Sequence, residues 1–149
     1  MLESEERGPL AQAKAVRIVM HITLESDYAV RIVVFLAQEQ KRVDANTISS
    51  HTGVSLRFAL KILRNLVSCG IARSFKGTQG GYELNRSPSE ITLRELLEAV
   101  EGEYVFSRCL GGGDCSNPDG SGCKVRRVFG QITQTVRGML DQVTMDQLM

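Results

Sequence analysis

A stretch with three cysteines, residues 109–123, constrains the fold of this chain more than any other. Five residues separate Cys109 from Cys115, and seven separate Cys115 from Cys123. Five glycines and one proline in this stretch exclude a stable helix or strand, because glycine is costly to order and proline removes a backbone donor. The stretch is therefore a pliable loop in which three thiolates can converge, which suits a metal centre better than a hydrophobic core.

The composition indicates a cytoplasmic protein of one domain, or of one domain with an extension. The chain has 149 residues, of which 42% are apolar. No apolar run approaches the length of about 20 residues that crosses a membrane, so we expect no membrane partner. The first residues are acidic where a secretory signal would be basic. In a reducing cytosol, four cysteines indicate metal or redox chemistry before they indicate disulfides.

The charges are divided between two neighbouring segments, although the net charge is only +1. Residues 54–82 contain no acidic side chain and five basic ones, namely Arg57, Lys61, Arg64, Arg73 and Lys76. Residues 89–104 contain five glutamates against one arginine. A basic block beside an acidic block favours an anion-binding face with a separate second surface. The alternative is an ordinary scatter of surface charge.

Helix caps and apolar patterns predict two helices at the start of the folded region. Thr23 is a good N-cap, and residues 28–37 are apolar almost all round, which predicts a buried central helix. Asp44 begins a short second helix, which stops at a Thr-Gly turn at residues 52–53.

A third helix is predicted from Ser55, as its N-cap, to Ser68. Its apolar positions recur at helical spacing and predict a core stripe of Leu56, Ala59, Leu60, Leu63, Leu66 and Val67. Its basic residues fall on the opposite side, with Ser68 in the same row. A short helix, a glycine-containing turn and a capped basic helix form the helix-turn-helix pattern.

The second helix of such a motif lies in the major groove of DNA. We expect Ser55 and Arg57 near the base edges with Leu56 between them, and Lys61 and Arg64 within reach of bases or phosphates. The alternative is the solvated face of an ordinary amphipathic helix.

A β-hairpin is predicted to follow the third helix. Residues 71–75 and 82–84 are strand-like and are joined by a basic, glycine-rich tip. This is the pattern of the wing in a winged helix, with charge from Arg73 and Lys76. Gln79 could read a base edge, and Gly80 allows the backbone to approach a phosphate closely. No strand–loop–helix with a P-loop lysine surrounds these glycines, so we do not expect a nucleotide-binding loop.

A long helix is predicted after the cysteine loop. Apolar positions recur every three or four residues from Val125 to Val143, and a second copy of the chain is the simplest partner for this stripe. The alternative is a monomer in which this helix covers its own first helix. Thr92 caps a shorter helix over residues 93–100. The expected organisation is an N-terminal extension (1–19), a winged helix-turn-helix domain (20–87), a connecting helix and linker (88–108), the cysteine loop (109–123) and a dimerisation helix (124–149).

Four stretches together resemble a bacterial family that includes the iron–sulfur-cluster regulator IscR and the nitric-oxide-responsive repressor NsrR. They are residues 20–31, residues 54–66, the wing at 76–82 and the cysteine loop. The resemblance covers about residue 20 to the end of the chain. It implies a mostly α-helical, homodimeric winged-helix regulator that binds double-stranded DNA at a palindromic promoter site. It also implies crossed dimerisation helices and an iron–sulfur cluster held by the cysteine loop.

The resemblance also bears on the ligands of the cluster. The second gap in the loop holds seven residues where relatives commonly have five, and Arg126 stands where IscR-like members carry a histidine. Arginine has no lone pair to donate to iron. Asp27 resembles the aspartate that some nitric-oxide-sensing members supply from the partner subunit, which makes it the candidate fourth ligand. The alternatives are a first-turn helix charge at Asp27, with a nearby glutamate or an exogenous ligand on the iron. Cys69 is expected to pack as a small buried side chain.

The cysteine spacing favours an iron–sulfur cluster over zinc, because structural zinc sites use cysteines two to four residues apart. A 2Fe–2S cluster is favoured over a 4Fe–4S cluster, and thiol redox switching is the third alternative. We therefore expect a repressor of iron–sulfur cluster biogenesis genes whose promoter affinity is controlled by the cluster. The alternatives are a nitric-oxide or redox-sensing repressor, or a cluster-free winged-helix regulator. The chain shows no nucleophile–base pair, nucleotide fingerprint or paired carboxylates, so we do not expect an enzyme.

Overall fold

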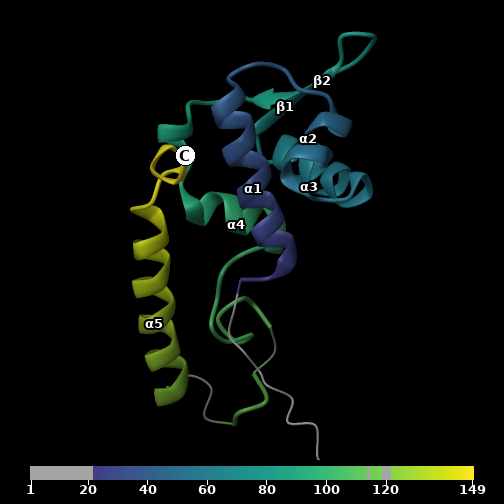
Figure 1. The fold of residues 1–149 in the computed structure, drawn as a ribbon. Coiled ribbons are helices and arrows are strands. Elements are labelled where there is room, and N and C mark those ends of the chain that lie inside the picture. Colours follow the sequence, from purple (N-terminus) through teal and green to yellow (C-terminus); the bar gives the residue numbers. More distant parts are fainter. Residues whose placement is uncertain (1–21, 114, 119–121) are drawn as a thin grey trace, which may run out of the picture.

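The computed structural model describes residues 22–113, 115–118 and 122–149, so the expected extension at 1–19 lies outside the described residues. The helices and the hairpin follow the predicted order (Figure 1). The elements are α1 (Leu24–Glu39), α2 (Ala45–Thr52), α3 (Leu56–Ser68), β1 (Ala72–Phe75), β2 (Gly81–Leu84), the 3₁₀ turn η1 (Pro88–Glu90), α4 (Leu93–Glu101), α5 (Lys124–Asp141) and the 3₁₀ turn η3 (Met145–Leu148).

The predicted caps begin α1 and α2. The Thr23 hydroxyl accepts a hydrogen bond from the Ser26 N–H at 3.2 Å. Asp44 accepts hydrogen bonds from the Thr47 hydroxyl and from two backbone N–H groups, and these bonds lower the pKa of its carboxyl. Ser55 occupies the N-cap position of α3, but its side chain makes no capping hydrogen bond. The boundary predicted at Ser55 is confirmed, whereas the hydrogen bond expected of its hydroxyl is not formed.

Helix α1 is the central support of the domain, as its apolar sequence predicts. Ile32, Val33 and Leu36 are fully buried, and α1 packs against α2, α3 and α4. Burying an aliphatic side chain contributes about 1.5–3 kcal/mol, so this helix organises much of the core. The chain end also reaches this core: Met145 of η3 is fully buried, and its N–H donates to the Ile91 carbonyl at 3.0 Å.

The apolar stripe of α3 is narrower than its sequence predicts. The buried side chains of α3 are Ala59, Ile62, Leu63 and Leu66. Leu56 and Leu60 were expected in the core, but they are 38% and 37% exposed. Both leucines lie at the edge of the stripe, where α1, α2 and α4 no longer cover the helix. The basic residues Arg57, Lys61 and Arg64 are exposed, as predicted.

Cys69 is exposed, so the prediction that it packs inside is wrong. It is the C-cap residue of α3, and Gly70 then turns the chain with φ of +74°. Ile71 takes the buried place at this corner, and its N–H donates to the Leu66 carbonyl at 2.9 Å. The larger aliphatic side chain removes more apolar surface from water, so it occupies the core.

Strands β1 and β2 form the predicted antiparallel hairpin, with Arg73 opposite Glu83 and Phe75 opposite Gly81. The hairpin is held to the domain through Val43, which forms a bridge with Tyr82. Gly81 makes this approach feasible, because a Cβ there would lie 2.6 Å from the Val43 carbonyl oxygen.

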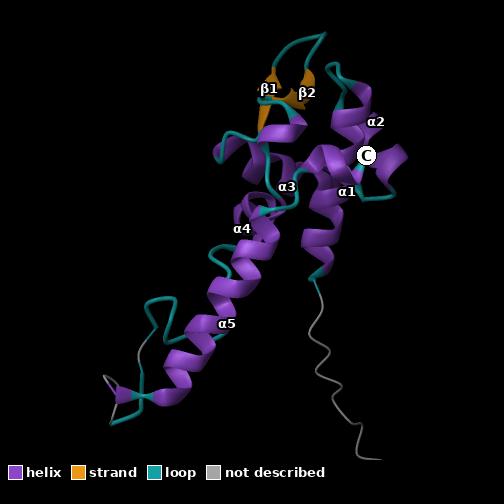
Figure 2. Ribbon diagram, turned by 90° about the vertical axis from the view of Figure 1, so that its left-hand side faces the viewer, coloured by secondary structure: helices purple, strands orange, loops and turns teal. Residues whose placement is uncertain are grey.

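Helix α5 extends away from the domain, with its first turn farthest from the hairpin (Figures 1 and 2). It packs against α4 near its end. Two ion pairs join these helices: Arg94 lies 2.7 Å from Asp141, and Arg137 lies 3.3 Å from Glu98. The alternative in which α5 covers α1 is therefore not the arrangement of this structure.

The revised core of α3 predicts different costs for two neighbouring truncations. Ile62→Ala should lower the free energy of unfolding by about 2–5 kcal/mol, because it opens a cavity at a fully buried site. Leu60→Ala should lower it by about 1 kcal/mol or less, since that side chain is already partly in water. Chemical denaturation of both variants measures the difference. Equal losses of unfolding free energy would show that Leu60 contributes to the core as much as Ile62 does.

Candidate nucleic-acid interface and cysteine loop

The exposed side of α3 carries the residues predicted to meet DNA. Arg57, Lys61, Arg64 and Ser68 are all exposed on the side opposite Leu63 and the rest of the buried stripe. The structure therefore brings these predicted residues onto one helix face. Guanidinium and ammonium groups on one face can meet phosphates and the acceptor edges of guanine.

One cation on this face has an internal partner that was missed from the sequence. Lys61 Nζ lies 2.9 Å from Glu25 Oε2 in the first turn of α1. The Lys61 side chain is 55% exposed and the Glu25 side chain 25% exposed, and water around the lysine keeps the contribution of the pair to stability small. A phosphate that approached Lys61 would have to compete with Glu25 for the ammonium group. No local signal in the sequence pairs two residues 36 positions apart.

The hairpin places its polar residues at two levels. At its base, Arg73 forms an ion pair with Glu83 at 2.6 Å across the ladder. At its tip, Lys76 and Gln79 are exposed, and Gly80 closes the turn. A Cβ at Gly80 would lie 2.7 Å from the Phe75 carbonyl oxygen, so this position excludes any side chain. Lys76 and Gln79 are therefore presented outward more directly than Arg73.

Arg42 supports the hairpin, and this role was also missed from the sequence. Its guanidinium lies 3.4 Å from the centroid of the Phe75 ring, and Nη1 donates to the Gln79 carbonyl at 3.1 Å. Arg42 lies between α1 and α2. These two contacts join the tip of the hairpin to the segment that connects α1 and α2.

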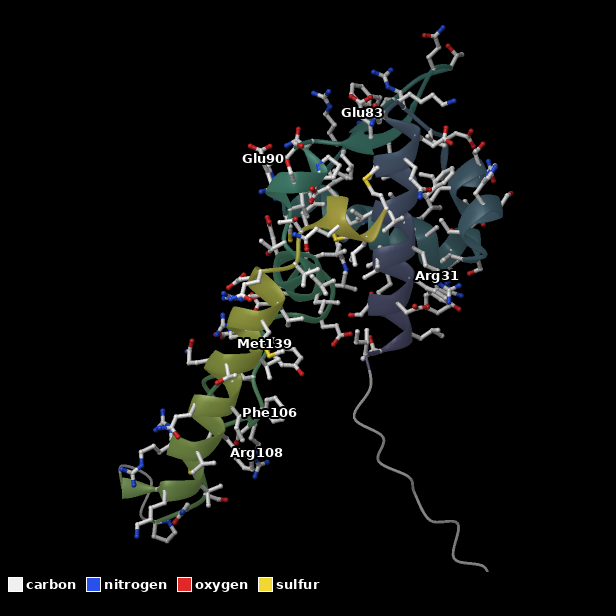
Figure 3. All side chains as sticks on the ribbon, turned by 60° about the vertical axis from the view of Figure 1, so that its left-hand side comes forward. Arg31, Glu83, Glu90, Phe106, Arg108 and Met139 are labelled. Carbon is white, nitrogen blue, oxygen red and sulfur yellow. The ribbon has the colours of Figure 1, made fainter. Side chains whose placement is uncertain are left out.

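The first half of the cysteine loop is held against α5. Thr133 is buried, and its hydroxyl accepts a hydrogen bond from the Phe106 N–H at 3.1 Å. Leu110 lies over Gly130, where a Cβ would meet it at an ordinary contact distance of 3.7 Å. Figure 3 shows Phe106 and Arg108 beside α5. Cys109 therefore lies on a segment that packs along the side of α5.

Cys123 is the N-cap residue of α5. Its Sγ accepts hydrogen bonds from the Arg126 N–H at 3.4 Å and from Asn117 Nδ2 at 3.5 Å. The hydrogen bond from the Arg126 backbone is the main cause that lowers the pKa of the Cys123 thiol. Thiolates at helix N-termini are good nucleophiles and good metal ligands.

All four cysteines are free thiols. Cys115 is exposed, while Cys109 and Cys123 are half-buried. Among residues 22–113, 115–118 and 122–149, no three cysteine, histidine or acidic side chains are gathered in a metal-binding arrangement. The donor set nevertheless fits an iron–sulfur cluster in its chemistry, because three reduced thiols on one loop are the ligands such clusters use.

The candidate fourth ligand, Asp27, lies in the first turn of α1 and forms an ion pair with Arg31 at 2.6 Å. The start of α1 and the start of α5 are well separated in both ribbon views (Figures 1 and 2). One chain therefore does not bring Asp27 to Cys123. His51 stacks on Phe35, and its Nδ1 lies 3.0 Å from the Thr47 carbonyl oxygen.

Comparisons with known proteins place the chain in a family. The profile of the Rrf2 family, described as "Iron-dependent Transcriptional regulator", matches residues 22–149. The chain belongs to the Rrf2 family. IscR, an HTH-type transcriptional regulator of Klebsiella pneumoniae (strain 342), is 29% identical over 131 residues, which cover 87% of this chain and 79% of that protein.

Two solved structures have the same fold as this Rrf2 protein. IscR of T. potens has a TM-score of 0.66 at 23% identity, covering 87% of this chain and 85% of that one. CymR, the global cysteine regulator of B. subtilis, has a TM-score of 0.68 at 20% identity, covering 87% and 96%. At these identities the likeness concerns the winged-helix fold with its long C-terminal helix.

Family membership confirms the resemblance found in the sequence. The protein is an Rrf2-family, DNA-binding transcriptional regulator rather than an enzyme. Within the described part of the chain, no helix is both long and apolar enough to cross a membrane.

The lowered pKa of Cys123 predicts how the metal-free protein reacts with iodoacetamide. The midpoint pH of Cys123 alkylation should be lower in the folded than in the urea-unfolded chain, because the thiolate reacts. Between the two pKa values the unfolded chain binds the extra proton, so the stability of the metal-free protein should rise with pH there.

Two substitutions at Arg126 distinguish the effect of its backbone N–H on the pKa of Cys123 from the effect of its side-chain charge. Arg126→Pro removes the backbone donor, in a first turn that tolerates proline, and should move the midpoint up towards the unfolded value. Arg126→Ala keeps that N–H and should retain most of the shift. Equal midpoints in the two variants would show that the backbone hydrogen bond is not the cause.

Proposed function

We propose that this Rrf2 regulator is a cytoplasmic homodimer whose affinity for a palindromic promoter site is controlled by an iron–sulfur cluster bound to Cys109, Cys115 and Cys123. The proposal is supported by three free thiols on one loop, of which Cys123 caps the start of α5. The start of α5 lies well away from α3 (Figure 1). A 2Fe–2S cluster is favoured, and repression of iron–sulfur cluster biogenesis genes is the corresponding role.

The exposed apolar side of α5 supports a homodimer. Five large apolar side chains of this helix are more than a third exposed: Val125, Val128, Phe129, Ile132 and Met139. Met139 is the most exposed of them, at 64%. An apolar stripe of this length in water favours association with a second copy of itself. A partner subunit is also the route by which Asp27 would reach the cysteine loop.

When bound, the cluster supplies bonds that join the three cysteine sulfurs and so order the loop. The residues of the chain then connect the loop to the DNA-binding domain. Phe106 and Thr133 fix the loop segment to α5, and Arg137 fixes α5 to Glu98 of α4. Glu101, at the end of α4, accepts hydrogen bonds from the Thr23 and Ser26 hydroxyls at the start of α1.

Helix α1 carries the connection to the recognition helix, because Glu25 in its first turn binds Lys61 of α3. These contacts support a population shift in which an ordered loop favours one placement of the two α3 helices. Loss of the cluster would release the loop and let the spacing of the half-sites vary. If holo and apo protein bind every operator equally, the cluster does not regulate DNA binding.

A second candidate function is thiol-based redox regulation without a cluster. The observation that favours it is the lowered pKa of Cys123, which makes this thiol reactive towards oxidants. In that case, reversible oxidation of a colourless protein would change its affinity for DNA. A nitric-oxide-sensing repressor would share the cluster and differ only in its signal.

The cluster is tested by its absorption spectrum and by iron and sulfide assays on anaerobically purified protein. Wild type should be brown with stoichiometric sulfide, and the alanine variants of Cys109, Cys115 and Cys123 should lose the colour because each loses a ligand. Cys69→Ala is the matched control and should keep the full spectrum, since Cys69 lies at the end of α3. A colourless wild-type protein would leave the redox candidate.

The DNA-binding face is tested by titrations of operator DNA at several salt concentrations. Arg57→Ala and Arg64→Ala should each weaken binding about tenfold or more, the cost of losing a good base or phosphate contact. Loss of a phosphate contact should also reduce the salt slope by about one. Lys124→Ala removes the same charge at the start of α5 and should leave the affinity nearly unchanged. Equal losses in all three variants would indicate a non-specific effect of net charge.

A further inference from the structure

Two leucines on the exposed face of α3 have no role in the core. Leu56 and Leu60 are 38% and 37% exposed and lie one helical turn apart. They line a groove along α3 together with Phe58 and the three cations Arg57, Lys61 and Arg64. The buried stripe of α3 is complete without them. Large apolar side chains beside three cations therefore need a different explanation.

The charges around the leucines identify the surface that covers them. Three cations on one groove favour a polyanion, and the protein belongs to a family of DNA-binding regulators. Phosphates and guanine edges offer nothing apolar to a leucine. The apolar group that the major groove presents is the 5-methyl of thymine, which aliphatic side chains contact directly.

We propose that Leu56 and Leu60 contact thymine methyl groups and so select thymine at defined positions of each half-site. The inference rests on the DNA-binding face proposed above and adds its sequence preference. Residues four apart on a helix are separated by about 6 Å along its axis. Successive bases on one strand are about 3.4 Å apart, so the selected thymines should lie within two base-pair steps.

Phe58 lines the same groove from the other edge of α3 and is 46% exposed, but its ring has a partner within the chain. Its ring packs edge-on against Tyr28 of α1, with ring centroids 6.2 Å apart. Leu56 and Leu60 lie on the opposite edge of the basic row, next to the side of α3 that carries Leu63. The proposal is therefore confined to the two leucines.

The experiment changes the DNA before it changes the protein. Full-length, anaerobically purified wild type first selects an operator from a random duplex library. Each thymine of that operator is then replaced by deoxyuridine, which removes only the methyl group. Replacement at a selected thymine should weaken binding about fourfold per half-site, the effect of losing one buried methyl group. Thymines outside the footprint of α3 are the controls and should tolerate replacement.

Protein variants then assign each methyl group to its leucine. Leu60→Ala should bind the thymine and uracil operators equally at one position, because the contact is already lost. Leu56→Ala should do the same at the other position. Leu60→Met keeps an apolar side chain of similar size and should retain the preference for thymine. Leu60→Ala and the deoxyuridine replacement form a double-mutant cycle. If their losses of binding free energy do not add, the difference measures the contact between Leu60 and the thymine methyl group.

Two results would overturn the inference, and they differ from failure of the proposed function. If wild type binds every uracil operator as tightly as the original while Arg57→Ala weakens binding, the DNA-binding face stands and the leucines do not read thymine. Unchanged discrimination in Leu60→Ala and in Leu56→Ala would also exclude them. If Arg57→Ala and Arg64→Ala have no effect on binding, the proposed DNA-binding face itself fails.

Discussion

The packing of α3 against α1 is the constraint on which the other features of this protein depend. Ala59, Ile62, Leu63 and Leu66 form a narrow buried stripe, so most of the circumference of α3 faces water. A recognition helix needs that free circumference, because it must contact bases and phosphates on a broad front. The same packing brings Lys61 to the first turn of α1. The stability of the domain and the orientation of its DNA-binding face therefore have one origin.

Most of the fold could be predicted from local signals in the sequence. Thr23, Asp44 and Thr92 cap their helices as predicted, and apolar periodicity places α1, α3, α4 and α5. The errors at Leu60 and Cys69 have a common cause. Periodicity shows which side of a helix faces the core, but it does not show how far the neighbouring elements extend over that side. Ile71 competes for the same corner as Cys69, and such competition is decided only when the elements pack.

The candidate site was predicted in its residue types more fully than in its connections. The cysteine spacing and the basic row of α3 are visible in the sequence. The contacts between Glu25 and Lys61, Arg42 and Gln79, and Phe106 and Thr133 join residues 27 to 37 positions apart. A single sequence contains no signal for such pairs, because each partner alone is an ordinary surface or helix residue. Two of these contacts, Phe106 with Thr133 and Glu25 with Lys61, belong to the proposed connection between the loop and the DNA-binding domain.

The C-terminal end of α5 is tied to the core, so the helix can act as a lever. Met145 lies in the core just beyond α5, and the Leu93 N–H donates a hydrogen bond to the Val143 carbonyl at 2.8 Å. This end of α5 is therefore the fixed point about which the helix would tilt. Eighteen helical residues span about 27 Å from there to Cys123. A tilt of about 10° at the fulcrum moves the cysteine end by about 5 Å at that length. A small rotation beside the core would therefore displace Cys123, at the opposite end of α5, by several times the shift at the anchored end.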